Sequence, residues 1–141
     1  MEWFLLAALS AFFAALVSIF AKIGLQGVDS TVATAVRAII MMLLIVFFVM
    51  STGKGPQLTQ FTSKDLGFIV LSGIAGALSW LFYFAALKLA DASKVAPVDK
   101  ASVLIVMVLA TLFLGEKITL KTATAGILIF IGILLLVVKL D

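Results

Sequence analysis

The chain has 141 residues, of which 65% are hydrophobic and 12% charged, and its mean hydropathy is +1.34. A soluble domain of 15.0 kDa could not bury so much apolar surface, so the composition predicts a protein whose solvent is the lipid bilayer. The lack of cysteine and histidine excludes disulfides, thiol nucleophiles and the usual zinc sites. The net charge of +3 comes from scattered lysines, so no nucleic-acid partner is predicted.

Five apolar segments account for almost the whole chain. A hydrocarbon core of ~30 Å requires ~20 helical residues at ~1.5 Å per residue. Helices are therefore expected at residues 3–22, 31–50, 65–88, 95–115 and 120–139. We predict an all-α membrane protein with five transmembrane helices, forming one domain over residues 1–141.

The first segment carries a stripe of small residues at three- and four-residue spacing. Its members are Ala7, Ala11, Ala14, Ala15 and Ser18. Small side chains let helix backbones approach closely in lipid, so the stripe predicts a helix-packing surface.

The second segment is uncharged only from residue 38 to residue 53, which is short for a full crossing. To reach full length its helix must begin near Thr31, which places Arg37 inside the membrane. An ionisable group there costs several kcal/mol unless it faces the bundle interior or water. Arg37 is therefore a candidate functional residue, whereas the pair Met41 and Met42 is expected to fill space.

Small and polar residues of the third segment follow spacings that place them on one helix face. They are Ser72, Gly76, Ser79 and Tyr83. Trp80 lies near the midplane, too deep for an interfacial belt of aromatic residues. Two interpretations stay open. The face packs against another helix, or it borders a cavity in which Trp80 and Tyr83 offer apolar and cation–π contacts to a solute.

The fourth segment is also short, because it is uncharged only from residue 101 to residue 115. A full crossing brings Asp99 and Lys100 into the membrane, at a depth similar to that of Arg37. We predict an interior contact between Arg37 and Asp99, whereas Lys100 could equally snorkel to the interface. Pro97, about one turn into this helix, is expected to be tolerated or to cause a mild kink.

Lysines are divided evenly between the two faces predicted for the bundle. The N-terminal face carries Lys54, Lys64, Lys117 and Lys121, and the opposite face carries Lys22, Lys88, Lys94 and Lys139. The positive-inside rule then gives no preferred orientation. An odd number of spans without an orientation bias favours two copies inserted in opposite orientations. A chance balance among so few lysines is the alternative.

Residues 91–97, with the sequence DASKVAP, lead into an apolar helix that closes with FLGEKIT at residues 113–119. This pattern, with Pro97, Gly115 and Glu116, resembles the fourth helix of an EamA domain in the drug/metabolite transporter superfamily. Members of that family typically carry two such domains as inverted repeats around a central cavity. The resemblance implies that this chain is one half of an inverted-repeat transporter and that a second, inverted copy supplies the other half.

The predicted function is secondary transport of small metabolites, amino-acid-like or other small organic solutes, by an antiparallel homodimer through alternating access. The residues expected to border the solute path are Arg37, Ser79, Trp80, Tyr83, Asp99 and Lys100. Two cations with one anion favour a solute that carries a carboxylate. Asp99 beside these cations is a poor proton carrier, so facilitated export or exchange is expected.

Two other functions stay open: a non-transporting scaffold or accessory subunit of a larger assembly, and a lipid-headgroup flippase. An enzyme is not expected, because no nucleophile–base pair or metal set can be assembled from these residues. No cofactor is expected either. The predicted location is the plasma membrane of a prokaryotic cell, as a multi-pass protein whose partners are lipid, a small solute and a second copy of itself.

Overall fold

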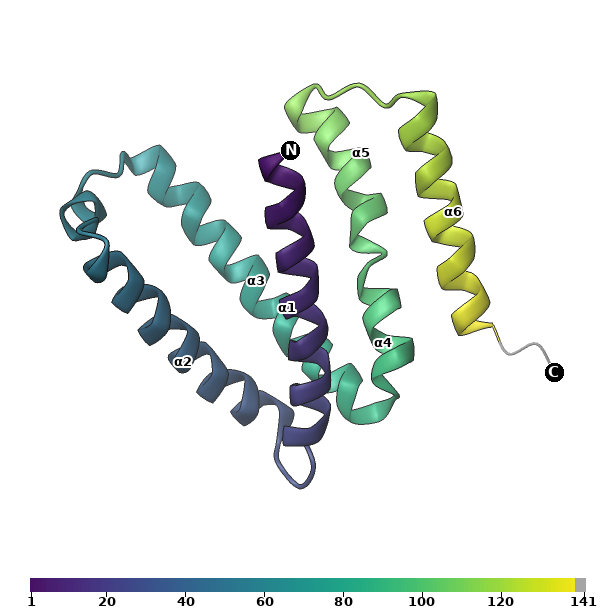
Figure 1. Ribbon diagram of the computed structural model, residues 1–141, viewed down its shortest axis with the longest axis horizontal. Coiled ribbons are helices and arrows are strands. Elements are labelled where there is room, and N and C mark those ends of the chain that lie inside the picture. The colour runs from purple at the N-terminus through teal and green to yellow at the C-terminus, as the bar shows by residue number, and fades with distance from the viewer. Residues whose placement is uncertain (139–141) are drawn as a thin grey trace. The chain divides into compact units, whose positions relative to one another are not determined.

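The computed structural model describes residues 1–138, and over these residues the chain is helical without strands (Figure 1). The elements are α1 (Glu2–Gly24), α2 (Ser30–Ser51), the 3₁₀-helix η1 (Gly55–Thr59), α3 (Ser63–Leu89), α4 (Ala92–Asp99), α5 (Ser102–Leu114) and α6 (Leu120–Val137). The predicted all-α class is confirmed. The predicted end of the last helix at residue 139 lies outside the described residues, as does Lys139.

Five helical segments are long and apolar enough to cross a bilayer. They are α1, α2, α3, the combined α4–α5 segment Ala92–Leu114, and α6, with lengths from 18 to 27 residues. At ~1.5 Å per residue these lengths correspond to roughly 27–40 Å, which matches the hydrocarbon core of a bilayer. The five predicted spans are confirmed, and the chain is a multi-pass membrane protein.

The fourth span differs from the single helix predicted over residues 95–115, because it is interrupted at Lys100 and Ala101. The amide of Ala101 donates to the carbonyl of Val98 at 2.9 Å, a bond that reaches back three residues rather than four. Such bonds belong to the tighter 3₁₀ helix, which is frequent where an α-helix is under strain. Pro97 has no N–H to donate, so the ladder is already weakened just before the interruption. The result is a break rather than a mild kink.

The turn between α5 and α6 is built from the family-like motif at residues 113–119. Gly115 has φ of 68°, a left-handed conformation that caps α5 and that glycine adopts without a Cβ clash. Thr119 then starts α6 as the N-cap of a capping box with Thr122. Residues outside the apolar core of each helix thus determine where α5 ends and α6 begins.

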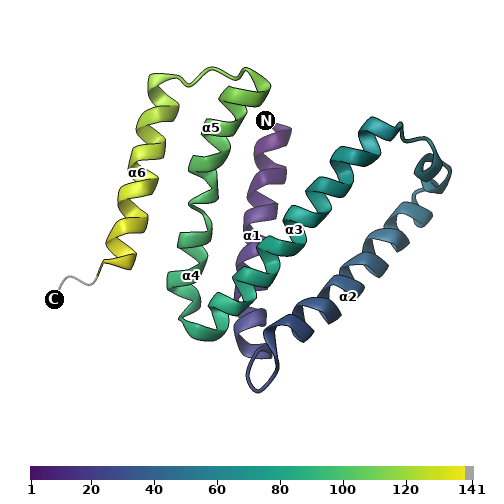
Figure 2. The same ribbon diagram turned by 180° about the vertical axis from the view of Figure 1, so that it is seen from behind.

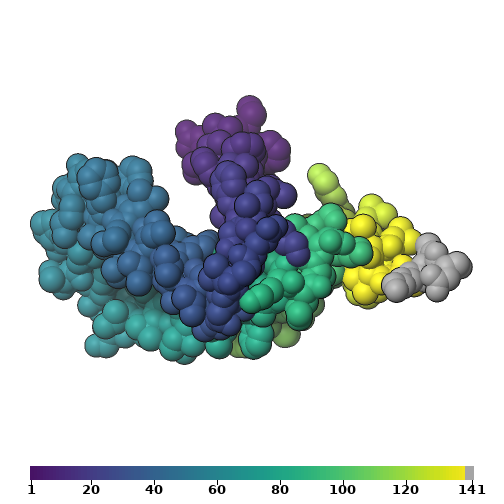
Figure 3. Space-filling model, turned by 90° about the horizontal axis from the view of Figure 1, so that it is seen from below, coloured from purple at the N-terminus to yellow at the C-terminus, as the bar shows by residue number. Residues whose placement is uncertain are grey.

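By its contacts the chain forms two compact units, Phe20–Leu89 and Met1–Ile19 with Ala90 onward. In the second of these, α6 packs against α4 and α5, and its yellow atoms meet green atoms of that segment in the space-filling view (Figure 3). Gly126 of α6 permits this approach, because a Cβ there would lie 3.3 Å from the Sδ atom of Met107. In the unit Phe20–Leu89, α2 packs along α3, and both ribbon views show the two helices side by side (Figures 1 and 2).

The best-packed part of the unit Phe20–Leu89 is the C-terminal end of α3. Phe84 is 3% exposed, Leu87 is fully buried, and Leu25 and Tyr83 are buried as well. Two lysines connect this end to the last turn of α1 and to the loop that follows it. The Nζ of Lys22 donates to the carbonyl of Leu87 at 2.6 Å, and the Nζ of Lys88 donates to that of Val28 at 2.8 Å.

The start of α2 is fixed by Asp29 as N-cap. Its Oδ1 accepts hydrogen bonds from the amides of Thr31 at 2.8 Å and Val32 at 3.1 Å, which satisfies two of the free N–H groups of the first turn. The amides of Val32 and Thr31 hold the pKa of the Asp29 carboxyl below its usual value, because they stabilise the ionised form. This cap fixes where α2, the helix that contains Arg37, begins.

Candidate functional site

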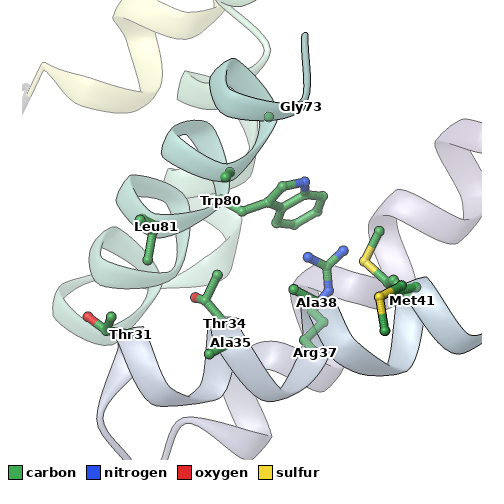
Figure 4. A pocket seen from close by; sticks show the side chains of 12 residues that line it. Thr31, Thr34, Ala35, Arg37, Ala38, Met41, Gly73, Trp80 and Leu81 are labelled. Carbon is green, nitrogen blue, oxygen red and sulfur yellow. The ribbon is translucent and has the colours of Figure 1, made fainter. Parts of the chain in front are cut away.

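Arg37 of α2 faces α3, and its guanidinium lies over the ring of Trp80. The Cζ atom is 3.6 Å from the centroid of the Trp80 ring and 5.3 Å from that of Phe84, and Figure 4 shows the guanidinium directed at the indole. Trp offers the strongest cation–π face among the aromatic side chains. The structure therefore brings together two of the predicted path residues, Arg37 and Trp80.

An aromatic cluster on α3 holds Trp80 in this position. Its ring centroid lies 5.7 Å from Tyr83 and 5.6 Å from Phe84, both in edge-on geometry. Tyr83 and Phe84 are themselves buried and 6.2 Å apart. Residues three and four positions apart lie on one helix face, so this packing follows from the sequence spacing. The ring under Arg37 is thus supported from behind by two packed neighbours.

A cavity of about 550 Å³ lies between α2 and α3 around this pair (Figure 4). This volume is within the usual range of roughly 300–1,000 Å³ for small-molecule sites. Its lining residues are Thr31, Thr34, Ala35, Arg37, Ala38, Met41, Met42, Gly73, Gly76, Ala77, Trp80 and Leu81. Arg37 is the one charged residue among them.

Small residues of α3 create the space on one side of the cavity. A Cβ added at Gly73 or Gly76 would meet no atom within 4 Å, so the room beside the α3 backbone is open. On the α2 side, Thr34 is buried and its hydroxyl donates to the carbonyl of Ser30 at 2.7 Å. The cavity wall is therefore apolar apart from two threonines and one guanidinium.

Sequence reasoning missed much of the α2 side of this cavity. The pair Met41 and Met42 was interpreted as filler, although both thioethers border the cavity. Thr34, Ala38 and Met41 share the three-, four- and seven-residue spacing of one helix face. That spacing, read together with Arg37, could have identified them.

The predicted polar face of α3 and the observed cavity face overlap at Gly76 only. Ser72, Ser79 and Tyr83 are not among the lining residues. Ser79 is exposed, and Tyr83 packs within the aromatic cluster. A role for Ser79 and Tyr83 in the solute path, and of Ser72 in helix packing, therefore stays a prediction.

Asp99 and Lys100 lie at the break between α4 and α5. The Nζ of Lys100 is 3.3 Å from the Oδ2 of Asp99, and the two side chains are 59% and 34% exposed, respectively. Arg37 belongs to the unit Phe20–Leu89 and Asp99 to the other unit. The contact predicted between Arg37 and Asp99 therefore stays a prediction.

The remaining predicted residues belong to helix packing. Ser18 is buried and its hydroxyl donates to the carbonyl of Ala14 at 3.0 Å, whereas Ala7 and Ala11 are exposed. The stripe as a packing surface stays a prediction. Over residues 1–138, no group of three His, Cys, Asp or Glu side chains is placed to hold a metal ion.

Comparison with known proteins extends these observations. A model of the protein family described as "EamA-like transporter family" matches residues 1–138. A protein of Sinorhizobium sp, described as "Uncharacterized transporter in cobO 3'region", is 42% identical over 137 residues, which cover 97% of each chain. No solved structure matches the chain. The family match spans all five membrane-crossing segments.

Proposed function

Because the chain belongs to the EamA-like transporter family, as its residues 91–119 predicted, we propose that it is a secondary transporter of small organic solutes. It works by alternating access, as an antiparallel homodimer in the plasma membrane of a prokaryotic cell. Membership of a transporter family also favours this function over an enzymatic one. The five spans support an inverted pair, because an odd number puts the two termini of one copy on opposite sides.

The observation that carries the proposal is the half-buried guanidinium of Arg37 in the wall of the cavity. Guanidinium groups bind carboxylates through two parallel hydrogen bonds, which gives both energy and orientation. Within the unit Phe20–Leu89, no carboxylate forms an ion pair with Arg37. Its positive charge is therefore held by aromatic rings and is ready for an anionic group of a solute.

The second copy completes the path. The other residues proposed to border the solute route are Ser79, Tyr83, Asp99 and Lys100. Rocking of one protomer against its inverted partner then exposes the cavity to each side of the membrane in turn. The mode of transport proposed is facilitated export or exchange, with Asp99 and Lys100 paired at 3.3 Å.

A flux measurement tests this function. Purified protein in liposomes should support saturable uptake of a radiolabelled carboxylate solute, and Arg37→Gln should lower this uptake at least ~10-fold, because a charge-assisted bidentate contact is lost. Lys54→Gln is the matched control, since Lys54 precedes η1 and makes no side-chain cap bond. Circular dichroism verifies folding of both variants. Absence of saturable flux over a panel of carboxylates would favour the scaffold, and unchanged flux in Arg37→Gln would remove this residue from the path.

The antiparallel pairing needs its own measurement. Reporters that are active on opposite sides of the membrane, fused to each terminus, should reveal both orientations in one cell population. A single orientation would exclude the inverted homodimer and leave a parallel assembly or a separate partner chain.

A further inference from the structure

We propose that the cavity between α2 and α3 selects small apolar monocarboxylates and discriminates against zwitterions that have the same apolar body. The selection concerns binding, and its importance for transport rests on the proposed function. Three features of the cavity carry the inference: one fixed positive charge, no negative charge, and apolar walls.

The single positive charge gives the site its sign. The Cζ atom of Arg37 lies 3.6 Å over the Trp80 ring, which stabilises the cation but cannot neutralise its charge. The guanidinium has five N–H donors, and its planar fork matches the two oxygens of a carboxylate. Arg37 is therefore suited to bind a planar anion.

An ammonium group has no counterpart in the same cavity. None of its lining residues is acidic. The nearest acidic residue before α2 is Asp29, whose Oδ1 already accepts two backbone amides, and it is not a lining residue. A desolvated ammonium that meets only the neutral hydroxyls of Thr31 and Thr34 and no negative charge is disfavoured, as is a second carboxylate. Zwitterions and dianions therefore bind more weakly than monoanions.

The walls define the rest of the ligand. Ala35, Ala38, Ala77 and Leu81 offer short aliphatic contacts, and the Met41 thioether can adapt to irregular shapes. A branched aliphatic or aromatic body suits such a surface. The same chemistry, an anion on an apolar body, is also offered by anionic lipids, so the experiment distinguishes a free solute from a lipid headgroup.

The chain supplies its own reporter for the test. It contains two tryptophans, Trp3 and Trp80, so Trp3→Phe leaves the indole under Arg37 as the only one. This protein, in phosphatidylcholine vesicles, is titrated with three compounds that share one branched aliphatic body. They are 4-methylpentanoate, leucine, which adds an α-ammonium group, and 3-methylbutylamine, which has only the ammonium group.

The expected result is a saturable change in Trp80 emission with 4-methylpentanoate. Leucine should bind at least ~30-fold more weakly, because its ammonium is left unpaired, and the amine should give no saturable change. Arg37→Gln in the same background should abolish the response, whereas Lys54→Gln should keep it. Leucine binding within threefold of 4-methylpentanoate, or a response that survives in Arg37→Gln, overturns the proposal.

A second arm identifies the source of the anion. Phosphatidylglycerol is added to the vesicles at high salt, which screens the surface charge. An unchanged response to 4-methylpentanoate supports a free solute. Loss of the response would assign the cavity to a lipid headgroup and overturn the selection proposed here.

Flux of the same compounds separates this inference from the proposed function. If leucine and 4-methylpentanoate bind equally but flux depends on Arg37, the selectivity is wrong and transport stands. If 4-methylpentanoate binds selectively but no carboxylate crosses the membrane, the selectivity stands and the transport proposal falls.

Discussion

The two polar sites of this chain deal with charge inside a membrane protein in different ways. Arg37 lies 3.6 Å over an indole that two packed aromatic residues support. Asp99 and Lys100 instead pair with each other at 3.3 Å next to a helix break, where Lys100 is exposed and Asp99 is half-buried. An aromatic ring stabilises a cation without using up its hydrogen-bond donors, whereas an ion pair satisfies both members. The charge of Arg37 therefore remains able to bind a ligand, whereas Asp99 and Lys100 are already paired with each other.

The largest expected effect concerns the aromatic support of Arg37. Phe84→Ala should lower the free energy of unfolding by about 2–4 kcal/mol, because it opens a cavity beneath Trp80 at a side chain that is 3% exposed. Phe82→Ala is the matched control on the same helix, since Phe82 is 73% exposed, and it should cost under ~0.5 kcal/mol. Unfolding in detergent, followed by circular dichroism, gives both values. Equal losses would show that the cluster does not pack as described.

An intermediate effect distinguishes local pairing of Asp99 from a long-range contact. A double-mutant cycle with Asp99→Asn and Lys100→Gln should give a coupling energy of at most ~1 kcal/mol, because the pair is largely exposed. The parallel cycle with Arg37→Gln tests the contact predicted from the sequence. A coupling above ~1.5 kcal/mol in that second cycle would establish the Arg37–Asp99 contact, and the two polar sites would then be one.

The smallest effect is a pH dependence at the start of the helix that carries Arg37. The amides of Val32 and Thr31 lower the pKa of Asp29 from its usual 3.8, so its stabilising effect is complete above that value. It is lost as the pH falls through the lower pKa of the folded state. Asp29→Asn should therefore reduce the decline in melting temperature below about pH 4. Identical profiles for Asp29→Asn and the unmodified protein would contradict the proposed role of this cap.

The five spans could be predicted from the sequence, because the length of an apolar segment is a strong signal in lipid. Arg37 and Trp80 were each singled out by their depth in a span, but their contact with each other was not predicted. The face of α3 that lines the cavity could not be predicted in this way. In water, polar residues mark the outside of a helix, but in a bilayer the outside is apolar as well, so Ser72 and Ser79 did not indicate the face that lines this cavity. Small residues, with the aromatic ring three or four positions along, were the better signal, as Gly76 and Trp80 demonstrate.

The break in the fourth span was missed for a different reason. The loss of one donor at Pro97 is visible in the sequence. Its consequence at Ala101 depends on which carbonyls accept hydrogen bonds from the following amides. The local sequence therefore indicated that the helix was weakened, but it did not indicate the position of the break.

The two hydrogen bonds from lysines to backbone carbonyls in the unit Phe20–Leu89 constrain how this unit can move. Separating α3 from the end of α1 and the turn that follows it would break both bonds and leave the carbonyl oxygens of Leu87 and Val28 without these donors. Near η1, by contrast, the side chains of both helices are largely exposed and nothing comparable has to be broken. Entry of a solute should therefore widen the gap at the η1 end while the lysine-bound end serves as the pivot.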